Sequence, residues 1–336
     1  MTFQSKTAIV FFIMAFLWKA DDTLAQQVEG FREVVVSVYD LPRATQYWRK
    51  VAGYEIRARA KNRQCPSWGN VPYNEVLLGN PGDTTGMIRL VKFKNTAQRH
   101  IRAGAKTWDS GGILDLNIRV KDINQKLQES EQQGWNAFSM PVRYQFGQFD
   151  VSETLLKGPD GVELALIQRH SPPLEGWPNL REFSHIFNSS QIVKNINTAL
   201  DFYQNKLGWK IYMKSITKGQ EGENVLGIPH NINPNVTRHV YILHPNAQNQ
   251  GSVELIHLEG LTGKDFSENA TPPNLGILTL RFPVKDIDTY AKQLCDRMVA
   301  LEIQPTTMHL KPYGKVKLMA LQAPDGAWLE FFEEIR

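Results

Sequence analysis

The stretch Glu33–Tyr54 reads EVVVSVYDLPRATQYWRKVAGY and holds the unit from which the whole chain is built. Its first six residues alternate in character, and a period of two predicts a strand whose two faces meet different surroundings. Asp40 follows at the position of a helix N-cap, where a short acceptor side chain is preferred. Gly53 then marks the turn after the helix. The stretch therefore predicts a strand followed at once by a short helix.

Three further segments repeat this pattern. They begin at Asp115, His185 and Thr279, and their predicted helices have caps of the same kind, at Asp122, Asn195 and Asp286. The first and third openings (33 and 185) lie 152 residues apart, and the second and fourth (115 and 279) lie 164 apart. The order is a duplicated pair, and we name the four units A, B, C and D. A unit of this size cannot bury its apolar face alone, so the units must stack on one another.

Each unit continues into further strands. Units B and D close with the same turn and strand, GPDGVEL at 158–164 and APDGAWL at 323–329. The apolar runs Val240–Leu243 and Val316–Leu321 predict strands that precede these closing segments or their equivalents. Each unit is therefore predicted to be a strand, a helix and about three more strands.

The length and composition fit two globular domains. The chain has 336 residues, of which 42% are hydrophobic and 21% charged. The stretch SPPLEGWP at 171–178 contains three prolines and a glycine, which cannot continue a helix or a central strand. We therefore expect a signal peptide at 1–25, a first domain at 26–170, a linker at 171–181 and a second domain at 182–336.

The N-terminal segment has the features of a secretory signal peptide. Lys6 provides a positive start, Ala8–Trp18 is an apolar run, and Thr23-Leu24-Ala25 offers a cleavage site near Ala25. The run is too short to span a bilayer comfortably, so no stable membrane anchor is expected, although an uncleaved anchor is the alternative. The sequence thus predicts export to the periplasm or the medium.

Charge and cysteine content restrict the partners. The formal net charge is only +4, and the densest basic stretch, Lys92–Lys106, is interpreted as a solvated connector, so no nucleic-acid partner is expected. The two cysteines, Cys65 and Cys295, lie in different halves of the chain and form no disulfide framework. We expect two isolated buried thiols, and their pairing stays open.

The repeated pattern resembles the vicinal oxygen chelate superfamily, which includes glyoxalase I, the bleomycin-resistance proteins and the extradiol dioxygenases. The resemblance lies in Val34–Leu41 with Tyr47-Trp48 and Gly53-Tyr54, and in Ala199–Tyr203 with Leu207-Gly208-Trp209. It implies an α+β fold of four βαβββ units in two tandem glyoxalase-like domains, each a curled, cup-shaped, mainly antiparallel sheet with helices outside. In the family a metal ion, where present, sits in the cup, with ligands from the first and last strand of each unit.

In the second half these positions fall on His185, Glu254, Thr279 and Glu330, with Asn188 as the rival of His185 if the strand has no insertion. One imidazole and two carboxylates suit a divalent ion. We predict that His185, Glu254 and Glu330 hold Zn, Fe, Mn or Ni, which the sequence does not distinguish. Glu254 and Glu330 are also the candidate catalytic residues, one of them as a general base. In the alternative interpretation, His185 is a hydrogen-bonded core residue and the glutamates pair with Arg281, which is also on the cup-facing side of its strand.

In the first half the same positions fall on Glu33, Arg89, Asp115 and Ala165. A guanidinium stays protonated and repels a cation. Glu33 and Asp115 are of the right sign to hold Arg89 by charge-assisted hydrogen bonds. The sequence therefore predicts a metal-free first half, in which a salt-bridge cluster of these three residues replaces the ion.

Two functions follow from this interpretation. The first is an exported metal-dependent enzyme of the isomerase, lyase or ring-cleaving dioxygenase type, acting on a small oxygenated substrate in the second-domain cup. The alternative is a metal-free protein that binds or sequesters a small molecule, as bleomycin-resistance proteins do. If Asn188 rather than His185 faces the glutamates, the ligand set is too poor and the binding protein is favoured. Assembly as a homodimer stays open.

Overall fold

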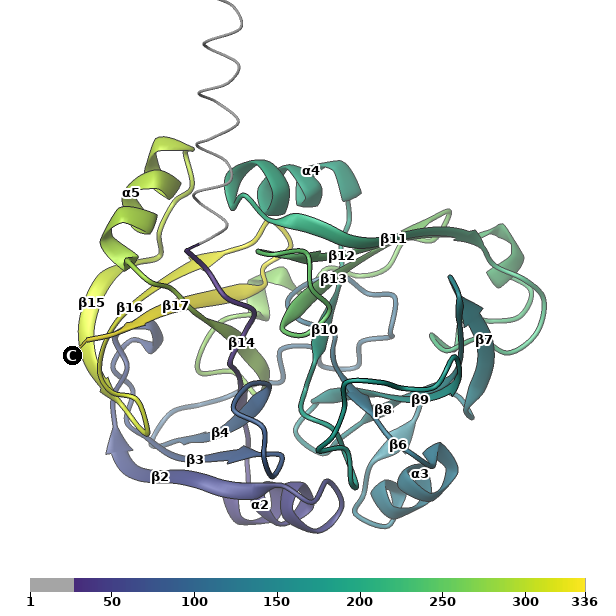
Figure 1. The fold of residues 1–336 in the computed structure, drawn as a ribbon, viewed down its shortest axis with the longest axis horizontal. Coiled ribbons are helices and arrows are strands. Elements are labelled where there is room, and N and C mark those ends of the chain that lie inside the picture. Colours follow the sequence, from purple (N-terminus) through teal and green to yellow (C-terminus); the bar gives the residue numbers. More distant parts are fainter. Residues whose placement is uncertain (1–26, 336) are drawn as a thin grey trace, which may run out of the picture.

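The computed structural model describes residues 27–335, and the predicted signal peptide lies outside the described residues. Within this range no helix is both long and apolar enough to cross a membrane. The described chain forms two strongly curled sheets with helices around them (Figure 1).

The four units have the predicted order of elements. Unit A comprises β1 (Glu33–Ser37), α2 (Leu41–Lys50), β2 (Glu55–Arg63), the 3₁₀ helix η1 (Pro66–Trp68), β3 (Tyr73–Gly79) and β4 (Met87–Phe93). Unit B comprises β5 (Asp115–Arg119), α3 (Ile123–Glu131), β6 (Asn136–Ala137), β7 (Val142–Phe146), β8 (Phe149–Lys157) and β9 (Glu163–Ser171). Unit C comprises β10 (Asn188–Ile192), α4 (Ile196–Leu200), the π-helical η2 (Asp201–Lys206), β11 (Lys210–Lys218), η3 (Asn233–Asn235), β12 (Thr237–His244) and β13 (Ser252–Glu259). The 3₁₀ helix η4 (Ser267–Asn269) leads to unit D, with β14 (Gly276–Pro283), α5 (Ile287–Asp296), β15 (Ile303–Leu310), β16 (Gly314–Gln322) and β17 (Trp328–Glu334).

The predicted helix caps are confirmed. Asp40 accepts a hydrogen bond from the backbone of Arg43, and the other three cap residues accept equivalent bonds at the starts of their helices. These side chains satisfy backbone N–H groups that the first turn of a helix leaves without partners. In every unit the first and last strands pair in parallel, as the βαβββ order requires.

The sheets join the units differently from the order along the chain. Strand β1 pairs antiparallel with β14, which builds an eight-stranded sheet from units A and D. Strand β5 pairs with β10, which builds a nine-stranded sheet from units B and C. The prediction that residues 26–170 and 182–336 each form a sheet of their own is therefore wrong. Each of these two halves of the chain contributes strands to both sheets. The free edge of a first strand can pair with the first strand of any other unit in antiparallel orientation. Pairing of A with D and B with C is therefore as open to the backbone as pairing of A with B and C with D.

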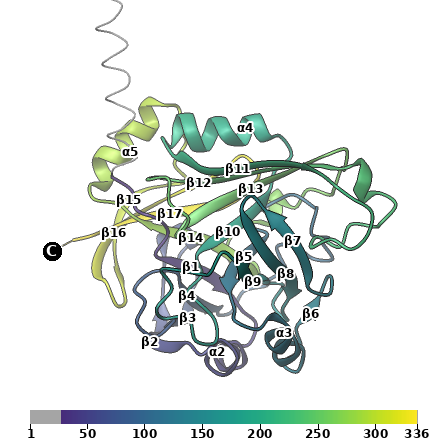
Figure 2. The ribbon, with the colours of Figure 1, turned by 45° about the vertical axis from the view of Figure 1, so that its right-hand side comes forward.

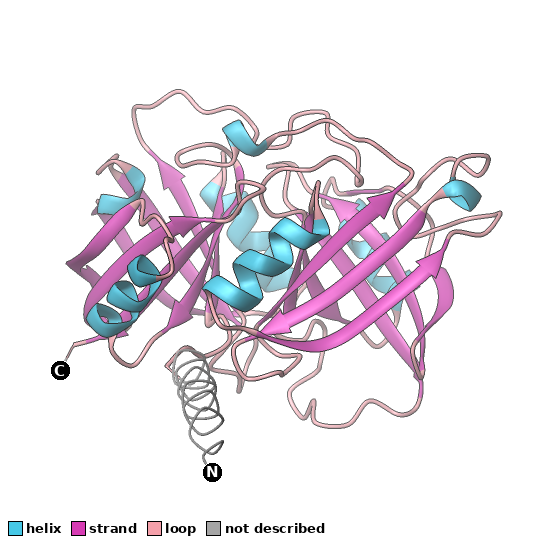
Figure 3. Ribbon diagram, turned by 90° about the horizontal axis from the view of Figure 1, so that it is seen from above, coloured by secondary structure: helices cyan, strands magenta, loops and turns pink. Residues whose placement is uncertain are grey.

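The main hydrophobic core lies between the convex faces of the sheets and the helices. All four first strands contribute to it, with Val34, Leu116, Val193 near the end of β10, and Leu280. Helices α4 and α5 lie along one side of the molecule, and α2 and α3 along the opposite side (Figures 1 and 2). Seen from above, the two curled sheets lie side by side (Figure 3). We call their concave faces the A/D cup and the B/C cup.

Candidate functional site

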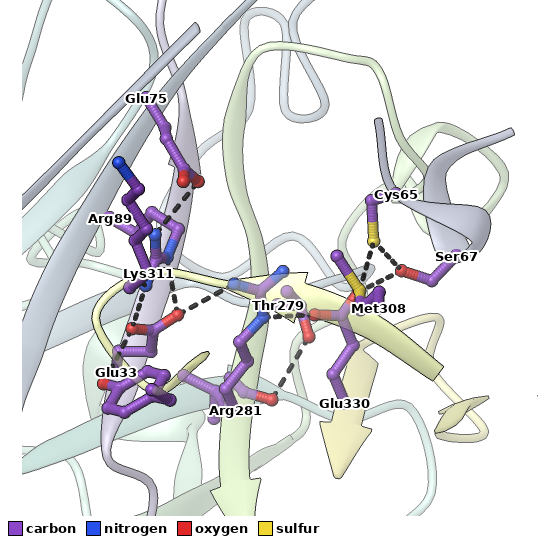
Figure 4. Close-up of polar contacts among 12 residues, drawn as sticks. Glu33, Cys65, Ser67, Glu75, Arg89, Thr279, Arg281, Met308, Lys311 and Glu330 are labelled. Atoms are coloured by element: carbon purple, nitrogen blue, oxygen red, sulfur yellow. Dashed lines mark hydrogen bonds and ion pairs between the residues drawn. The ribbon is translucent and has the colours of Figure 1, made fainter. Parts of the chain in front are cut away.

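The A/D cup holds a continuous chain of buried ion pairs (Figure 4). Glu75 lies 3.0 Å from Arg89, which binds Glu33 through two hydrogen bonds of 2.7 and 2.8 Å. Glu33 also accepts a bond of 2.8 Å from Arg281, which in turn donates one of 2.5 Å to Glu330. All five side chains are at most 2% exposed.

The charges in this cup are mutually satisfied. Burial alone would raise the pKa of Glu33, but the Arg89 and Arg281 guanidiniums outweigh it and lower the pKa to about 2. Glu33 also accepts a hydrogen bond of 3.0 Å from the Tyr313 hydroxyl. Arg89 donates a further bond of 2.7 Å to the Lys311 carbonyl. The network therefore fills the polar positions of the cup and keeps Glu33 ionised.

The same cup is plugged by the segment that contains η1. Trp68 and Ser67 donate hydrogen bonds of 2.8 and 2.5 Å to Glu330. The indole of Trp68 lies over the Arg281 guanidinium, 4.9 Å from it, and packs in a cluster with Val35 and Leu278. The plug therefore covers the Arg281–Glu330 end of the network with the side chains of Ser67 and Trp68.

The predicted first-half cluster is correct in two of its three members. Glu33 and Arg89 pair as expected, but Asp115 lies on β5 in the other sheet, because unit B does not share a cup with unit A. Glu330 pairs with Arg281, which is the pairing that the alternative interpretation gave for it. The Thr279 hydroxyl is buried and donates to a backbone carbonyl at 3.2 Å.

The B/C cup, in contrast, is open and hollow. It contains a cavity of 670 Å³, a volume that includes the open space at its mouth. Small-molecule pockets usually have volumes of about 300–1,000 Å³. The cavity is lined by polar residues from the first and last strands and by aromatic rings, namely Asn117, Arg119, Tyr144, Phe146, Phe149, Glu153, Arg169, Phe187, Asn188, Tyr212 and Glu254 among others. The cavity thus combines aromatic rings with several polar and charged side chains, which can fix the orientation of a small molecule.

Glu254 is the carboxyl that faces this cavity without a partner. It lies on β13 opposite Ser190 of β10, between two buried apolar neighbours, as its alternation in the sequence predicted. Among the described residues, no side chain or backbone group donates a hydrogen bond to it. Burial, together with the Glu153 and Asp115 carboxyls, raises the pKa of Glu254 to about 8, against the opposing effect of Arg119. The group therefore carries a proton at neutral pH.

The prediction for His185 is wrong. Asn188, not His185, opens strand β10, because the extra residues extend the segment before the strand instead of bulging from it. His185 pairs with Asp83 at 3.0 Å and stacks on Trp177, outside the cavity. Asn188 accepts a bond of 2.6 Å from Asn117 and donates one of 2.7 Å to Ser252. The three predicted ligands thus lie at three different places.

The family's metal positions do not fit a metal ion in either cup. In the structure the first-strand position of unit D falls on Arg281 and not on Thr279, because Arg281 lies beside both Glu33 and Glu330 on the paired strands, so two of the four positions in the A/D cup carry arginines. By the same pairing Asn117 and not Asp115 takes the position in unit B. The B/C cup therefore holds Asn117, Ala165, Asn188 and Glu254, and histidine and cysteine are absent from all four. Within residues 27–335 no three His, Cys, Asp or Glu side chains converge as metal ligands. The Asn188 amide oxygen, which could serve as a ligand, already accepts a hydrogen bond from Asn117.

Two arginines of the cavity were missed in the sequence. Arg119 alternates with Ile118 on β5 and so shares the face of Asn117, which its period of two could have indicated. Arg169 lies near the end of β9, beyond the positions that the family resemblance marks. The thiols are free as expected, Cys65 being buried, but Cys295 is exposed because it lies on the outer face of α5.

Comparisons with known proteins agree with this architecture. No family model matches the sequence, and a search of curated proteins finds no match. Among solved structures, glyoxalase I from Zea mays has a TM-score of 0.60 at 16% identity, covering 93% of this chain and 95% of that chain. A mutant of the same enzyme reaches 0.62, at 16% identity and with 94% and 96% covered. A proposed dioxygenase from Bacillus subtilis has a TM-score of 0.55 at 11% identity, with 92% and 86% covered.

The chain has the vicinal oxygen chelate fold. The resemblance that the sequence predicted is thereby confirmed for the fold, along almost the whole described chain. At these identities the fold does not transfer an activity, because one fold supports many unrelated sites. The function of this chain therefore depends on the residues that its two cups hold.

Proposed function

We propose that this protein binds a small molecule in the B/C cup without a resident metal ion, the A/D cup serving only as a scaffold. The observation that carries the proposal is the contrast between the cups. In one, every charged group is paired and a plug covers the network. In the other, a cavity walled by aromatic rings reaches a carboxyl that has no partner among residues 27–335.

A second candidate is supported by Glu254 itself. A carboxyl that keeps its proton to a pKa of about 8 and faces a cavity is suited to general acid–base work near neutral pH. The B/C cup would then convert its ligand by proton transfer, as an isomerase or lyase does. The metal-dependent enzyme predicted from the sequence is the third possibility, and the experiment below separates it from the other two. Export to the periplasm or the medium is part of the proposal, on the strength of residues 1–25.

The test combines elemental analysis with ligand binding. We expect the purified, folded protein to contain far less than one equivalent of Zn, Fe, Mn or Ni per chain. Small aromatic compounds should raise its melting temperature, because a ligand that binds only the folded state stabilises it. A stoichiometric ion would contradict the proposal and support the metal-dependent enzyme.

A pair of variants assigns the binding to this cup. Asn249→Trp, at a residue that lines the cavity, should abolish the ligand-induced shift in melting temperature. Gln248→Trp is the matched control, because the neighbouring side chain is exposed and does not line the cavity. Glu254→Gln should keep binding, and loss of turnover of a bound compound in that variant would favour the acid–base enzyme.

A further inference from the structure

Two arginine side chains share one wall of the B/C cavity. Arg119 on β5 and Arg169 on β9 come from neighbouring parallel strands, Arg119 pairing in register with Ile167. Each guanidinium lies against an aromatic ring, Arg119 at 4.5 Å from the centre of Phe187 and Arg169 at 3.9 Å from that of Phe149. These cation–π contacts hold the two guanidinium groups in place.

Neither guanidinium forms a direct ion pair. Among residues 27–335 no carboxylate lies within ion-pair distance of Arg119 or Arg169, and neither side chain donates a hydrogen bond, although the Glu153 and Glu254 carboxyls act on Arg119 from farther away. The Nε atoms of both are buried and unsatisfied, and Arg119 as a whole is only 7% exposed. Burial, and then repulsion from Arg169, lower the pKa of Arg119 to about 10, against the opposing attraction of the Glu153 carboxyl.

An arrangement of this kind is costly for the protein alone. Arginine is rarely buried without a partner, and an uncompensated buried charge destabilises a fold strongly. The A/D cup shows how the same fold supplies partners when the role is structural, since Arg89 and Arg281 are held there by three carboxylates. The missing partner of Arg119 and Arg169 is therefore to be sought in a ligand.

We propose that the B/C cup binds a planar aromatic carboxylate, with its carboxylate on Arg119 and Arg169 and its ring between the aromatic side chains of the cavity. The inference rests on the proposed function and names its ligand class. Guanidinium groups present paired N–H donors that match the two oxygens of a carboxylate. The aromatic side chains of the cavity provide faces and edges on which a flat ring packs. They are Tyr144, Phe146, Phe149, Phe187 and Tyr212.

The rest of the cavity suits a polar substituent on that ring. Glu254 lines the same cavity from β13, on the unit C side of the sheet, whereas the arginines lie on the unit B side. In its protonated form Glu254 can both donate and accept a hydrogen bond. A ring hydroxyl or carbonyl group would satisfy it without bringing a second negative charge into the cup.

The experiment compares acids with amides of the same shape. Isothermal titration at pH 7 would measure the binding of 4-hydroxybenzoate and 2-naphthoate to the full mature chain, beside 4-hydroxybenzamide and 2-naphthamide. We expect at least one acid to bind at least tenfold more tightly than its amide. Arg119→Gln and Arg169→Gln should each weaken the binding of that acid at least tenfold and change the affinity for its amide by less than twofold. Arg143→Gln is the control, because that exposed arginine pairs with Asp150 outside the cavity.

Each result decides one of the two proposals. If acids and amides bind equally well to the wild type, the carboxylate assignment falls and small-molecule binding in the cup stands. If none of the four compounds binds to the folded wild type, both fall. The melting temperature of unliganded Arg119→Gln gives a second readout: it should equal or exceed that of the wild type, because an unpaired buried charge is removed. A marked fall with unchanged acid binding would make Arg119 a structural residue and overturn the inference.

Discussion

Replacing Arg89 by methionine should destabilise the protein by about 4 kcal/mol. Arg89 is fully buried and binds Glu33 through two hydrogen bonds and Glu75 at 3.0 Å. Without it Glu33 keeps Arg281 and Tyr313, but Glu75, 2% exposed, has no other ion-pair partner among residues 27–335. Removing one partner of a buried ion pair costs about 3–5 kcal/mol, because a charge is left without compensation in the interior.

Urea denaturation followed by circular dichroism at pH 7 would measure this free energy of unfolding. The double variant Arg89→Met/Glu75→Gln should recover part of the loss, since it removes the stranded charge together with its partner. Arg143→Met serves as the surface control and should change the free energy little, because exposed ion pairs contribute little. A loss below about 1 kcal/mol for Arg89→Met, the lower end of what a buried group costs, would refute the argument for a desolvated network.

The same variant should also change the response to acid. The pKa of Glu33 is about 2 in the folded protein, well below its unfolded value, because Arg89 and Arg281 overcome the effect of burial. A carboxyl with a lowered pKa contributes stability above its unfolded pKa, and this contribution is lost as the pH falls towards the folded value. The wild type should therefore lose stability between about pH 4.5 and pH 2 more steeply than Arg89→Met.

Two further predictions concern the plug and the N-terminus. Trp68→Ala should lower the free energy of unfolding by about 3–5 kcal/mol, the usual cost of removing a buried aromatic ring, and millimolar indole should restore part of the melting temperature. If indole raised the melting temperature of the wild type by the same amount, the effect would not come from the space left by Trp68. N-terminal sequencing of exported material should give a chain that begins near Gln26, and a chain that still begins at Met1 would argue against cleavage.

The units of the fold could be predicted because their signals are local. The period of two in β1 and β5, the caps Asp40 and Asp122, and the repeated Pro-Asp-Gly turn each act over a few residues. Short-range patterns of this kind need no knowledge of the partner element. The alternation that placed Glu254 on the cup face is of the same type, and it held in the structure.

The choice of partner for each unit could not be predicted in this way. An edge strand presents the same backbone groups to any antiparallel copy, so nothing in the β1 sequence distinguishes β14 from β5. This single choice separated Glu254 from Glu330 and Arg89 from Asp115, because it sent them to different cups. A second ambiguity was the start of β10, where three extra residues could either bulge or lengthen the preceding segment. In the structure the extra residues lengthen the segment before the strand, so Asn188 and not His185 lies in the cup.

Comparing equivalent positions explains why one cup is closed and the other open. In unit A, Arg89 lies beside Val35 on the paired strands, and its charge is met by Glu33 on the same sheet. The equivalent residue of unit C, Glu254, lies beside Ser190, and an amide, Asn188, stands where Glu33 would. Likewise Arg281 and Glu330 of unit D correspond to Asn117 and Ala165 of unit B, where no charge is present.

The B/C cup therefore lacks, at these positions, the paired charges that close the A/D cup; it has Glu254 where unit A has Arg89, and it carries two arginines farther along its strands. A fold gains nothing in stability from unpaired charges in a cavity, since each would be better placed in water or beside an opposite charge. Such groups persist where a ligand completes them, and the binding energy they provide is then greater than that of groups already satisfied. On this reasoning the closed cup supplies the stability that allows its twin to remain incomplete.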